Sequence, residues 1–83
     1  MTDLIDVHMG RRLRRRRVIL DLTQSDVGKA VGVSFQQIHK YESGEQRMTA
    51  GMLWKLSRTL EAPPAYFYDG YLVDNNEIRA VAI

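Results

Sequence analysis

Apolar residues recur at intervals of three and four along most of this chain, which is the pattern of helices that bury one face. The first stretch predicts a helix over about residues 6–20, with Met9 and Leu13 on its inner side. Six of the seven residues 11–17 are arginine, so part of that run must lie over the core. Asp21 is expected to end the helix, because aspartate tolerates the left-handed backbone better than most residues.

Two shorter helices are predicted next, joined by a tight turn. Thr23 suits the N-cap of the first, and Gly32 suits its end, because glycine adopts a positive φ without steric penalty. Ser34 suits the N-cap of the second, which runs to about Glu42 and ends before Gly44. The apolar positions expected to face the core are Val27, Val31, Val33 and Ile38.

A further helix is predicted to begin at Thr49, and its inner stripe consists of Met52, Leu53, Leu56 and Leu60. Pro63 and Pro64 stop this helix, because proline has no backbone N–H and restricts the residue before it. Pro64 also predicts a single helical turn over residues 64–68, which folds Phe67 back on the core.

These elements predict an all-α domain, compact and built from five helices, over residues 1–69, with residues 23–44 as its central motif. Residues 70–83 are expected to form a C-terminal tail that fits either a short helix or a frayed end. This tail is a candidate dimerisation or partner segment. A chain of 83 residues has room for one small domain with a limited core.

Composition excludes several kinds of site. There is no cysteine, and His8 and His39 are too few and too far apart to suggest a metal site. The first ten residues carry no basic residue, so they do not resemble a secretory signal, and the longest aliphatic run, residues 18–20, is too short to span a membrane. We therefore expect a cytoplasmic protein with no cofactor, no membrane contact and no evident small-molecule site. An enzyme is not expected, because the sequence has no histidine–carboxylate cluster and no phosphate loop.

The net charge of +2 conceals a strongly basic middle. Residues 11–60 hold 11 lysines and arginines against 4 acidic residues, whereas residues 1–10 and 61–83 are both net acidic. A basic region between acidic ends favours an anionic partner such as nucleic acid. A well-solvated surface produces the same pattern, so charge alone leaves both interpretations open.

Residues 23–44, TQSDVGKAVGVSFQQIHKYESG, contain three positions at which a helix-turn-helix requires a particular kind of residue. Gly28 is expected where the two helices cross, Gly32 at the turn, and Ile38 in the core beneath the second helix. A random amphipathic hairpin rarely meets all three demands, so the pattern is a specific indication of a helix-turn-helix.

At these residues the chain resembles the phage-repressor and Cro type of helix-turn-helix, the XRE-like family of bacterial regulators. The resemblance covers residues 6–69 and includes the ending LWKLSRTLEAPPAYF. It implies a lambda-repressor-like fold and a homodimer that binds a near-palindromic operator in double-stranded DNA. Two positions depart from the family pattern: many members have glycine where this chain has Asp21, and alanine is commoner where it has Gly28. Gly28 should weaken its helix by about 0.5–1 kcal/mol.

The exposed side of the second motif helix carries the candidate base-reading residues, which are Ser34, Phe35, Gln36 and Lys40. The Gln36 amide can pair bidentately with adenine N6 and N7, which gives about 1–3 kcal/mol of discrimination. Lys40, about one turn further on, can reach a base or a phosphate. Phe35 can contact a thymine methyl group or pack on the preceding helix, and the sequence leaves both open. Ser34 is expected to combine capping with a backbone contact.

A second set of residues is expected on the DNA backbone: Arg17, Thr23, Gln24, Gln37, Arg47 and Thr49. The resemblance implies that Gln24 donates to a phosphate at the start of its helix, where exposed amides suit an anion. It also implies an ion pair between Arg17 and Glu42, which joins the first helix to the end of the third. Arg47 belongs to residues 45–49, a segment that should lie along the backbone.

The function expected from this pattern is transcriptional regulation, most simply repression. A twofold dimer would place its two reading helices about 34 Å apart, one turn of DNA. The contact surface that the resemblance implies is near residues 61–66. The apolar tail positions Leu72, Ile78 and Val81 are candidates to extend it.

Two alternatives remain open on sequence alone. The first is the antitoxin of a toxin–antitoxin pair, which binds both its operator and a toxin protein, although residues 70–83 are barely long enough to hold a toxin. The second is an RNA binder led by the arginine run. RNA-binding modules usually offer exposed aromatic side chains for stacking, whereas the aromatic residues expected to be structural here are Tyr41, Trp54, Tyr66 and Phe67.

Overall fold

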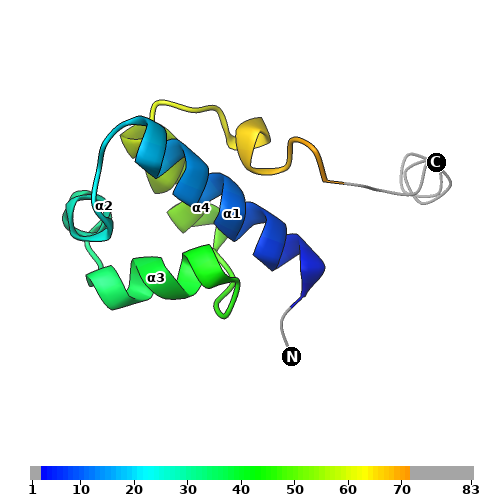
Figure 1. Cartoon of the computed structure of the whole chain (residues 1–83), viewed down its shortest axis with the longest axis horizontal. Coiled ribbons are helices and arrows are strands. Elements are labelled where there is room, and N and C mark those ends of the chain that lie inside the picture. The colour runs from blue at the N-terminus through cyan, green and yellow to red at the C-terminus, as the bar shows by residue number, and fades with distance from the viewer. Residues whose placement is uncertain (1–2, 72–83) are drawn as a thin grey trace, which may run out of the picture.

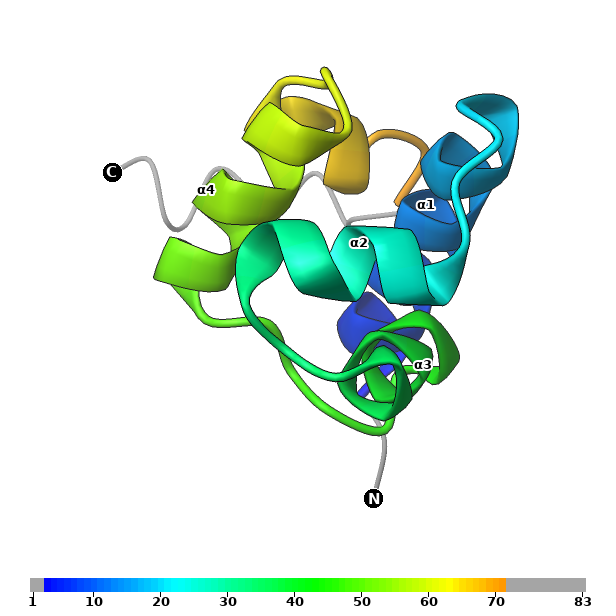
Figure 2. The same cartoon turned by 90° about the vertical axis from the view of Figure 1, so that its left-hand side faces the viewer.

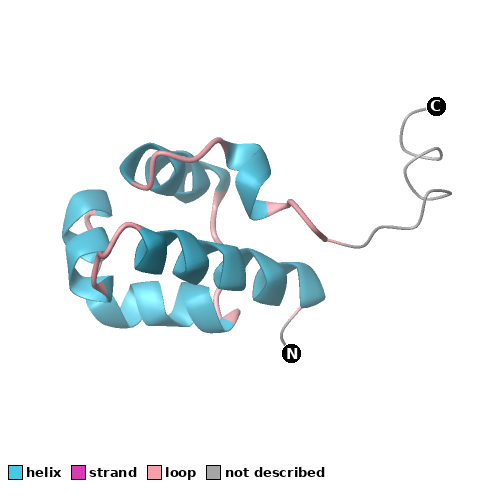
Figure 3. Ribbon diagram, turned by 45° about the horizontal axis from the view of Figure 1, so that its top comes forward, coloured by secondary structure: helices cyan, strands magenta, loops and turns pink. Residues whose placement is uncertain are grey.

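The computed structural model describes residues 3–71, which form four α-helices and one short 3-10 helix. The elements are α1 (Leu4–Ile19), α2 (Gln24–Val31), α3 (Phe35–Ser43), α4 (Ala50–Thr59) and the 3-10 helix η1 (Pro64–Phe67). Throughout these residues the chain is helix or connecting loop, with no strand (Figure 3). The expected all-α fold is confirmed.

The helices enclose a single core. In Figure 1, α1 crosses the front of the molecule with α3 below it, and Figure 2 shows α2 lying between α1 and α4 with α3 beneath. Every element contributes to the centre, because the fully buried side chains are Leu13, Val27, Ile38, Leu56, Leu60 and Phe67. This core fixes the position of α3 relative to the other helices.

The fifth element differs from the expected helix. The segment after Pro63 closes through bonds between residues three apart, from Tyr66 N to Pro63 O at 2.9 Å and from Tyr68 N to Ala65 O at 3.1 Å. This spacing is that of a 3-10 helix, which the short run following two prolines adopts. The prediction of five helices is therefore corrected to four α-helices and one 3-10 turn. Phe67 is fully buried, as expected.

Helix α1 starts two residues earlier than the sequence pattern indicated. The carboxylate of Asp3 accepts a hydrogen bond from the backbone N–H of Ile5 at 3.2 Å, so Asp3 is the N-cap. Ile5 lies in this first turn, four residues before Met9, and packs against the core, so the apolar spacing extends to the observed start of the helix, while Leu4 is largely exposed. At the other end Asp21 adopts a left-handed backbone with φ of 58°, as predicted.

The caps expected around the motif are present. The Thr23 hydroxyl accepts from Asp26 N at 3.0 Å, and the Asp26 carboxylate accepts from Thr23 N at 2.8 Å. Two hydrogen bonds hold the pKa of Asp26 below its ordinary value: the larger effect comes from the Thr23 backbone and the smaller from the Thr23 side chain. The Ser34 hydroxyl accepts from Gln37 N at 3.2 Å and caps α3. These bonds fix where α2 and α3 begin.

Gly28 lies where α2 and the turn to α3 are in close contact, as the motif requires. A Cβ atom at this position would lie 2.6 Å from the carbonyl oxygen of Val33, in the turn between α2 and α3. Gly32 makes that turn with φ of 82°. The motif register read from the sequence is thus the one in the structure.

The arginine run divides between two sides of α1. Arg12 Nε donates to the carbonyl of Tyr66 at 2.9 Å, and its guanidinium lies 3.8 Å from the centroid of the Tyr66 ring. Arg16 Nε donates to the carbonyl of Leu60 at 2.8 Å. Both residues therefore bind the C-terminal part of the fold to α1. The exposed members of the run are Arg11, Arg14 and Arg15.

Candidate nucleic-acid interface

Helix α3 has one buried face and one solvent-exposed face. Ile38 and Tyr41 are buried, whereas Gln36 and Lys40, four residues apart and therefore neighbours on the helix surface, are exposed on the other side. The helix lies along the lower edge of the molecule in Figure 1. The two side chains predicted to read bases are thus presented together by a rigid element.

The start of α3 holds the other two candidate base readers. Phe35 is 52% exposed, so packing on α2 accounts for only part of its surface. Ser34 is exposed, and its hydroxyl already accepts the capping bond from Gln37 N. Ser43 was not predicted as a site residue, although it is exposed and follows Lys40 by three positions. The spacing 36, 40 and 43 places it on the same exposed side of α3, where its hydroxyl donates to the carbonyl of Lys40 at 3.1 Å.

The Arg17–Glu42 ion pair implied by the resemblance is present. Arg17 Nε donates to Glu42 Oε2 at 2.6 Å, and Nη2 donates to Oε1 at 3.0 Å. The third donor, Nη1, reaches the carbonyl of Leu22 at 2.9 Å. The hydrogen bond with Glu42 raises the pKa of Arg17 above its ordinary value. This pair joins α1 to α3 and largely neutralises the charge of Arg17.

Gln24 joins the same network from α2. Its Nε2 donates to Glu42 Oε1 at 3.1 Å and lies 3.5 Å from His39 Nδ1. The structure thus brings together three of the residues that the resemblance singled out, one from each helix. The two amide N–H groups of Gln24 thus face Glu42 Oε1 and, at the longer distance, His39 Nδ1.

A hollow of about 820 Å³ opens where α1, α2 and α3 meet. The residues around it include Arg14, Thr23, Gln24, Phe35 and His39. Two of these, Thr23 and Gln24, are predicted backbone contacts, and Phe35 is a predicted base reader. The hollow therefore lies beside the exposed face of α3.

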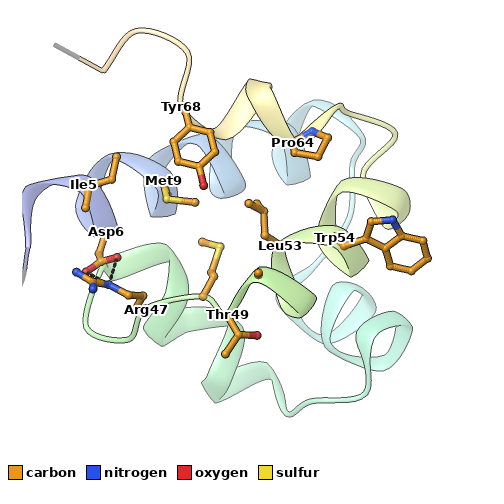
Figure 4. A pocket seen from close by; sticks show the side chains of 11 residues that line it. Ile5, Asp6, Met9, Arg47, Thr49, Leu53, Trp54, Pro64 and Tyr68 are labelled. Carbon is orange, nitrogen blue, oxygen red and sulfur yellow. Dashed lines mark hydrogen bonds and ion pairs between the residues drawn. The ribbon is translucent and has the colours of Figure 1, made fainter. Parts of the chain in front are cut away.

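Two further predicted backbone residues, Arg47 and Thr49, lie near the start of α4, whereas Gln37 is a half-buried residue in the first turn of α3. Arg47 is 66% exposed in its side chain, but its Nε donates to both oxygens of Asp6, at 3.1 and 3.2 Å (Figure 4). Its Nη2 donates to Asp3 at 3.1 Å. These contacts, with Asp6 first, raise the pKa of Arg47. Thr49 caps α4 by accepting from Met52 N at 3.0 Å. Sequence reasoning did not identify the two aspartates that bind Arg47.

Trp54 is not the structural aromatic residue that we expected. Its side chain is 61% exposed and points outward in Figure 4, with the Arg58 guanidinium 5.6 Å from its ring centroid. Leu56 and Leu60 supply the fully buried contacts of this part of α4, and Trp54 lies to the side of them. A groove of about 450 Å³ beside Trp54 is lined by apolar side chains that include Ile5, Met9, Leu53 and Tyr68.

Within residues 3–71, no three or more histidine, aspartate or glutamate side chains group in a way that could hold a metal ion. In the same part of the chain, no helix has the length and apolar character needed to cross a membrane.

Comparison with protein families and curated proteins gives a consistent result. The helix-turn-helix family model matches residues 13–67. An uncharacterized HTH-type transcriptional regulator of Sinorhizobium fredii is 42% identical over 76 residues, which is 92% of this chain and 51% of that protein. Repressor protein C2 of Salmonella phage P22 is 38% identical over 68 residues, 82% of this chain and 32% of that protein. The chain spans about half the length of the rhizobial relatives that it matches.

Solved structures show the same similarity. The crystal structure of the P22 c2 repressor in complex with a synthetic operator matches with a TM-score of 0.70 and 39% identity, over 75% of this chain and 94% of that one. The restriction-modification controller protein C.AhdI of Aeromonas hydrophila also matches with a TM-score of 0.70, at 24% identity, over 74% of this chain and 92% of that one. The second match supports the fold alone.

Proposed function

This chain belongs to the helix-turn-helix family of transcriptional regulators, and from that premise we propose that it binds double-stranded DNA with α3 in the major groove. The observation that carries the proposal is the exposed pair Gln36 and Lys40 on a helix whose opposite face is fixed in the core. A glutamine amide reads adenine, and a lysine reads guanine or contacts a phosphate. The site of action is the bacterial cytoplasm.

The regulator acts as a repressor in this proposal. The P22 protein, which matches in both sequence and structure, is a repressor whose structure was determined with a synthetic operator. Arg17 and Gln24, predicted to lie on the DNA backbone, both donate to Glu42 of α3 and so lie beside the proposed reading helix. A domain of this size bound across a promoter would exclude polymerase without needing any further activity.

Two copies on a near-palindromic operator would place their α3 helices about 34 Å apart. The surface proposed for contact between the copies is the one around residues 61–66. A hollow of about 560 Å³ lies there, bordered by Trp54, Arg58 and Pro63. Tryptophan and arginine are both enriched among the residues that dominate binding at protein interfaces. The tail positions Leu72, Ile78 and Val81, also expected to contribute, lie outside the described residues.

Selection of bound duplexes from a random pool tests the proposal directly. We expect an enriched sequence with twofold symmetry, and binding whose log K falls by about 0.9 per phosphate contact for each log unit of salt. Sedimentation with the selected duplex should show two chains per site. Failure to bind any duplex at low salt would refute DNA binding. A strict 1:1 complex at saturating protein would refute the dimer and leave DNA binding intact.

Binding to RNA or to a protein from a neighbouring gene is tested in the same format. Single-stranded and hairpin RNA of the selected sequence should compete poorly with the duplex. A neighbouring-gene product that binds this chain with the affinity of the operator would favour the antitoxin function.

A further inference from the structure

We propose that Arg14, rather than Arg17, supplies the cation that binds a DNA backbone phosphate in the hollow between α1, α2 and α3. The inference rests on the proposed DNA binding and specifies where the backbone passes over α1. It assigns the phosphate to the side of α3 that carries Phe35 and His39.

The first argument is that Arg17 is already occupied. Its Nε, Nη1 and Nη2 all donate within the protein, two of them to Glu42, and its side chain is only 12% exposed. The Glu42 carboxylate is 5% exposed and cancels the charge. A phosphate approaching this pair would meet a neutral unit with two remaining N–H groups. Arg17 therefore adds little net attraction for an anion.

The second argument is the position of Arg14. It precedes Arg17 by three residues on α1, so the two side chains are neighbours on the helix surface. Arg14 is exposed, and none of the ion pairs formed within residues 3–71 includes it. It lines the 820 Å³ hollow, as the paired Arg17 also does, together with Thr23 and Gln24, which were predicted as backbone contacts. An uncompensated guanidinium thus borders the same hollow as the amide of Gln24.

The third argument is that the hollow links the phosphate to base recognition. Phe35 and His39, from the first two turns of α3, form its opposite wall. A phosphate held between Arg14 and Gln24 would therefore determine how deeply α3 inserts into the major groove of the DNA. Arg14 has five N–H donors in a planar fork, which suits bidentate phosphate contact.

One group in the hollow opposes an anion. The carboxylate of Asp21 lines the same space. Its backbone is left-handed, with φ of 58°, and asparagine tolerates this conformation at least as well as aspartate. Asp21→Asn therefore removes one negative charge without straining the turn, and it provides a second probe of the same site.

The test compares Arg14→Gln with Arg15→Gln on the selected operator and on a random duplex. Arg15 is also exposed and on the same helix, but it does not line this hollow. We expect Arg14→Gln to weaken binding about tenfold on both duplexes, as the loss of one charged hydrogen-bonded contact. The magnitude of the salt slope should fall by about 0.9. Arg15→Gln should leave the slope unchanged and weaken binding less.

The Asp21→Asn variant distinguishes a direct contact between Arg14 and a phosphate from a general electrostatic attraction of the whole surface for DNA. It should tighten binding to both duplexes and leave the salt slope unchanged, because it adds no phosphate contact. In the Arg14→Gln background this gain should be smaller. Thermal unfolding of each variant should stay within a few degrees of wild type, since all three side chains are exposed.

Equal slopes and equal losses for Arg14→Gln and Arg15→Gln would overturn the assignment, because they would mean that only total charge matters. A wild-type chain that binds no duplex at low salt would instead remove the proposed function itself. The two failures are therefore distinguishable in one experiment.

Discussion

Gly10 of α1 packs directly against the carbonyl oxygen of Tyr41 in α3. A Cβ atom on residue 10 would overlap that oxygen and would lie 2.6 Å from the carbonyl oxygen of Glu42. The two helices therefore touch backbone to backbone at this point. The contact holds α3 at the distance from α1 that the Arg17–Glu42 pair requires.

Gly10→Ala should destabilise the fold, because the obstructing atoms belong to the backbone and cannot rotate away. We expect a loss of about 1–3 kcal/mol in the free energy of unfolding, measured by chemical denaturation. Gly51→Ala is the matched control, since that glycine is exposed in α4 and its nearest neighbour would be Thr49 Oγ1 at 4.0 Å. The control should gain about 0.5–1 kcal/mol from helix propensity. Similar changes in both variants would contradict the close approach.

Glu42→Gln should leave Arg17 charged and nearly buried without a counter-charge. The expected loss is about 3–5 kcal/mol of unfolding free energy at pH 7. Glu45→Gln, an exposed carboxylate nearby, should change stability by less than about 0.5 kcal/mol. The double variant Arg17→Met with Glu42→Leu should be more stable than Glu42→Gln alone, because it removes both charges. A double variant less stable than the single one would show that the ion pair itself is stabilising.

Gln36→Ala should relax base preference at one position in each half-site, with a loss of about 1–3 kcal/mol on the preferred duplex and little on random DNA. Gln24→Ala should weaken binding to all duplexes alike. Because Gln24 also donates to Glu42, its stability must be measured beside its affinity. If the two variants showed the same dependence of affinity on DNA sequence, the assignment of base readout to Gln36 and of backbone anchoring to Gln24 would be wrong.

The capping box of α2 predicts a pH dependence. The pKa of Asp26 is lowered in the folded state, so the unfolded chain binds its proton more readily and stability falls with falling pH. Relative to Asp26→Asn, wild type should be more stable at pH 7, and the difference should shrink from about pH 3.8 downward and disappear below the folded pKa. Denaturant titrations from pH 7 to pH 2 measure it. A difference that persists at pH 2 would mean that the carboxylate charge is not its origin.

Sequence patterns were sufficient to predict those features of the fold that depend on residues close together in the chain. Thr23, Ser34 and Gly32 act within a few residues of their partners, so capping chemistry and backbone preference determine them. The apolar spacing placed Ile38 in the core, and with it the outward direction of Gln36 on the same helix. The exposed face of α3 was therefore predictable before any tertiary contact was known.

Residues whose partners are distant in sequence were not predictable in this way. Helix phase showed that part of the arginine run faces inward, but it did not show that Arg12 would meet the carbonyl of Tyr66. The pairing of Arg47 with Asp6 joins residues 41 apart, and no local pattern marks it. Trp54 lies at the edge of its stripe, where periodicity does not decide between a buried and an exposed side chain.

The contacts of Arg16 with Leu60 and of Arg12 with Tyr66 join residues 44 and 54 apart, and they limit how this motif can be transplanted. A fragment that ends at Gly44 would carry both helices of the motif, yet it would lack Phe67 and the leucines of α4 that complete the core. A graft of the two helices therefore needs a scaffold that supplies an equivalent core beneath them. Engineering by substitution on the outer face of α3, with the rest of the fold retained, is the route that this architecture permits.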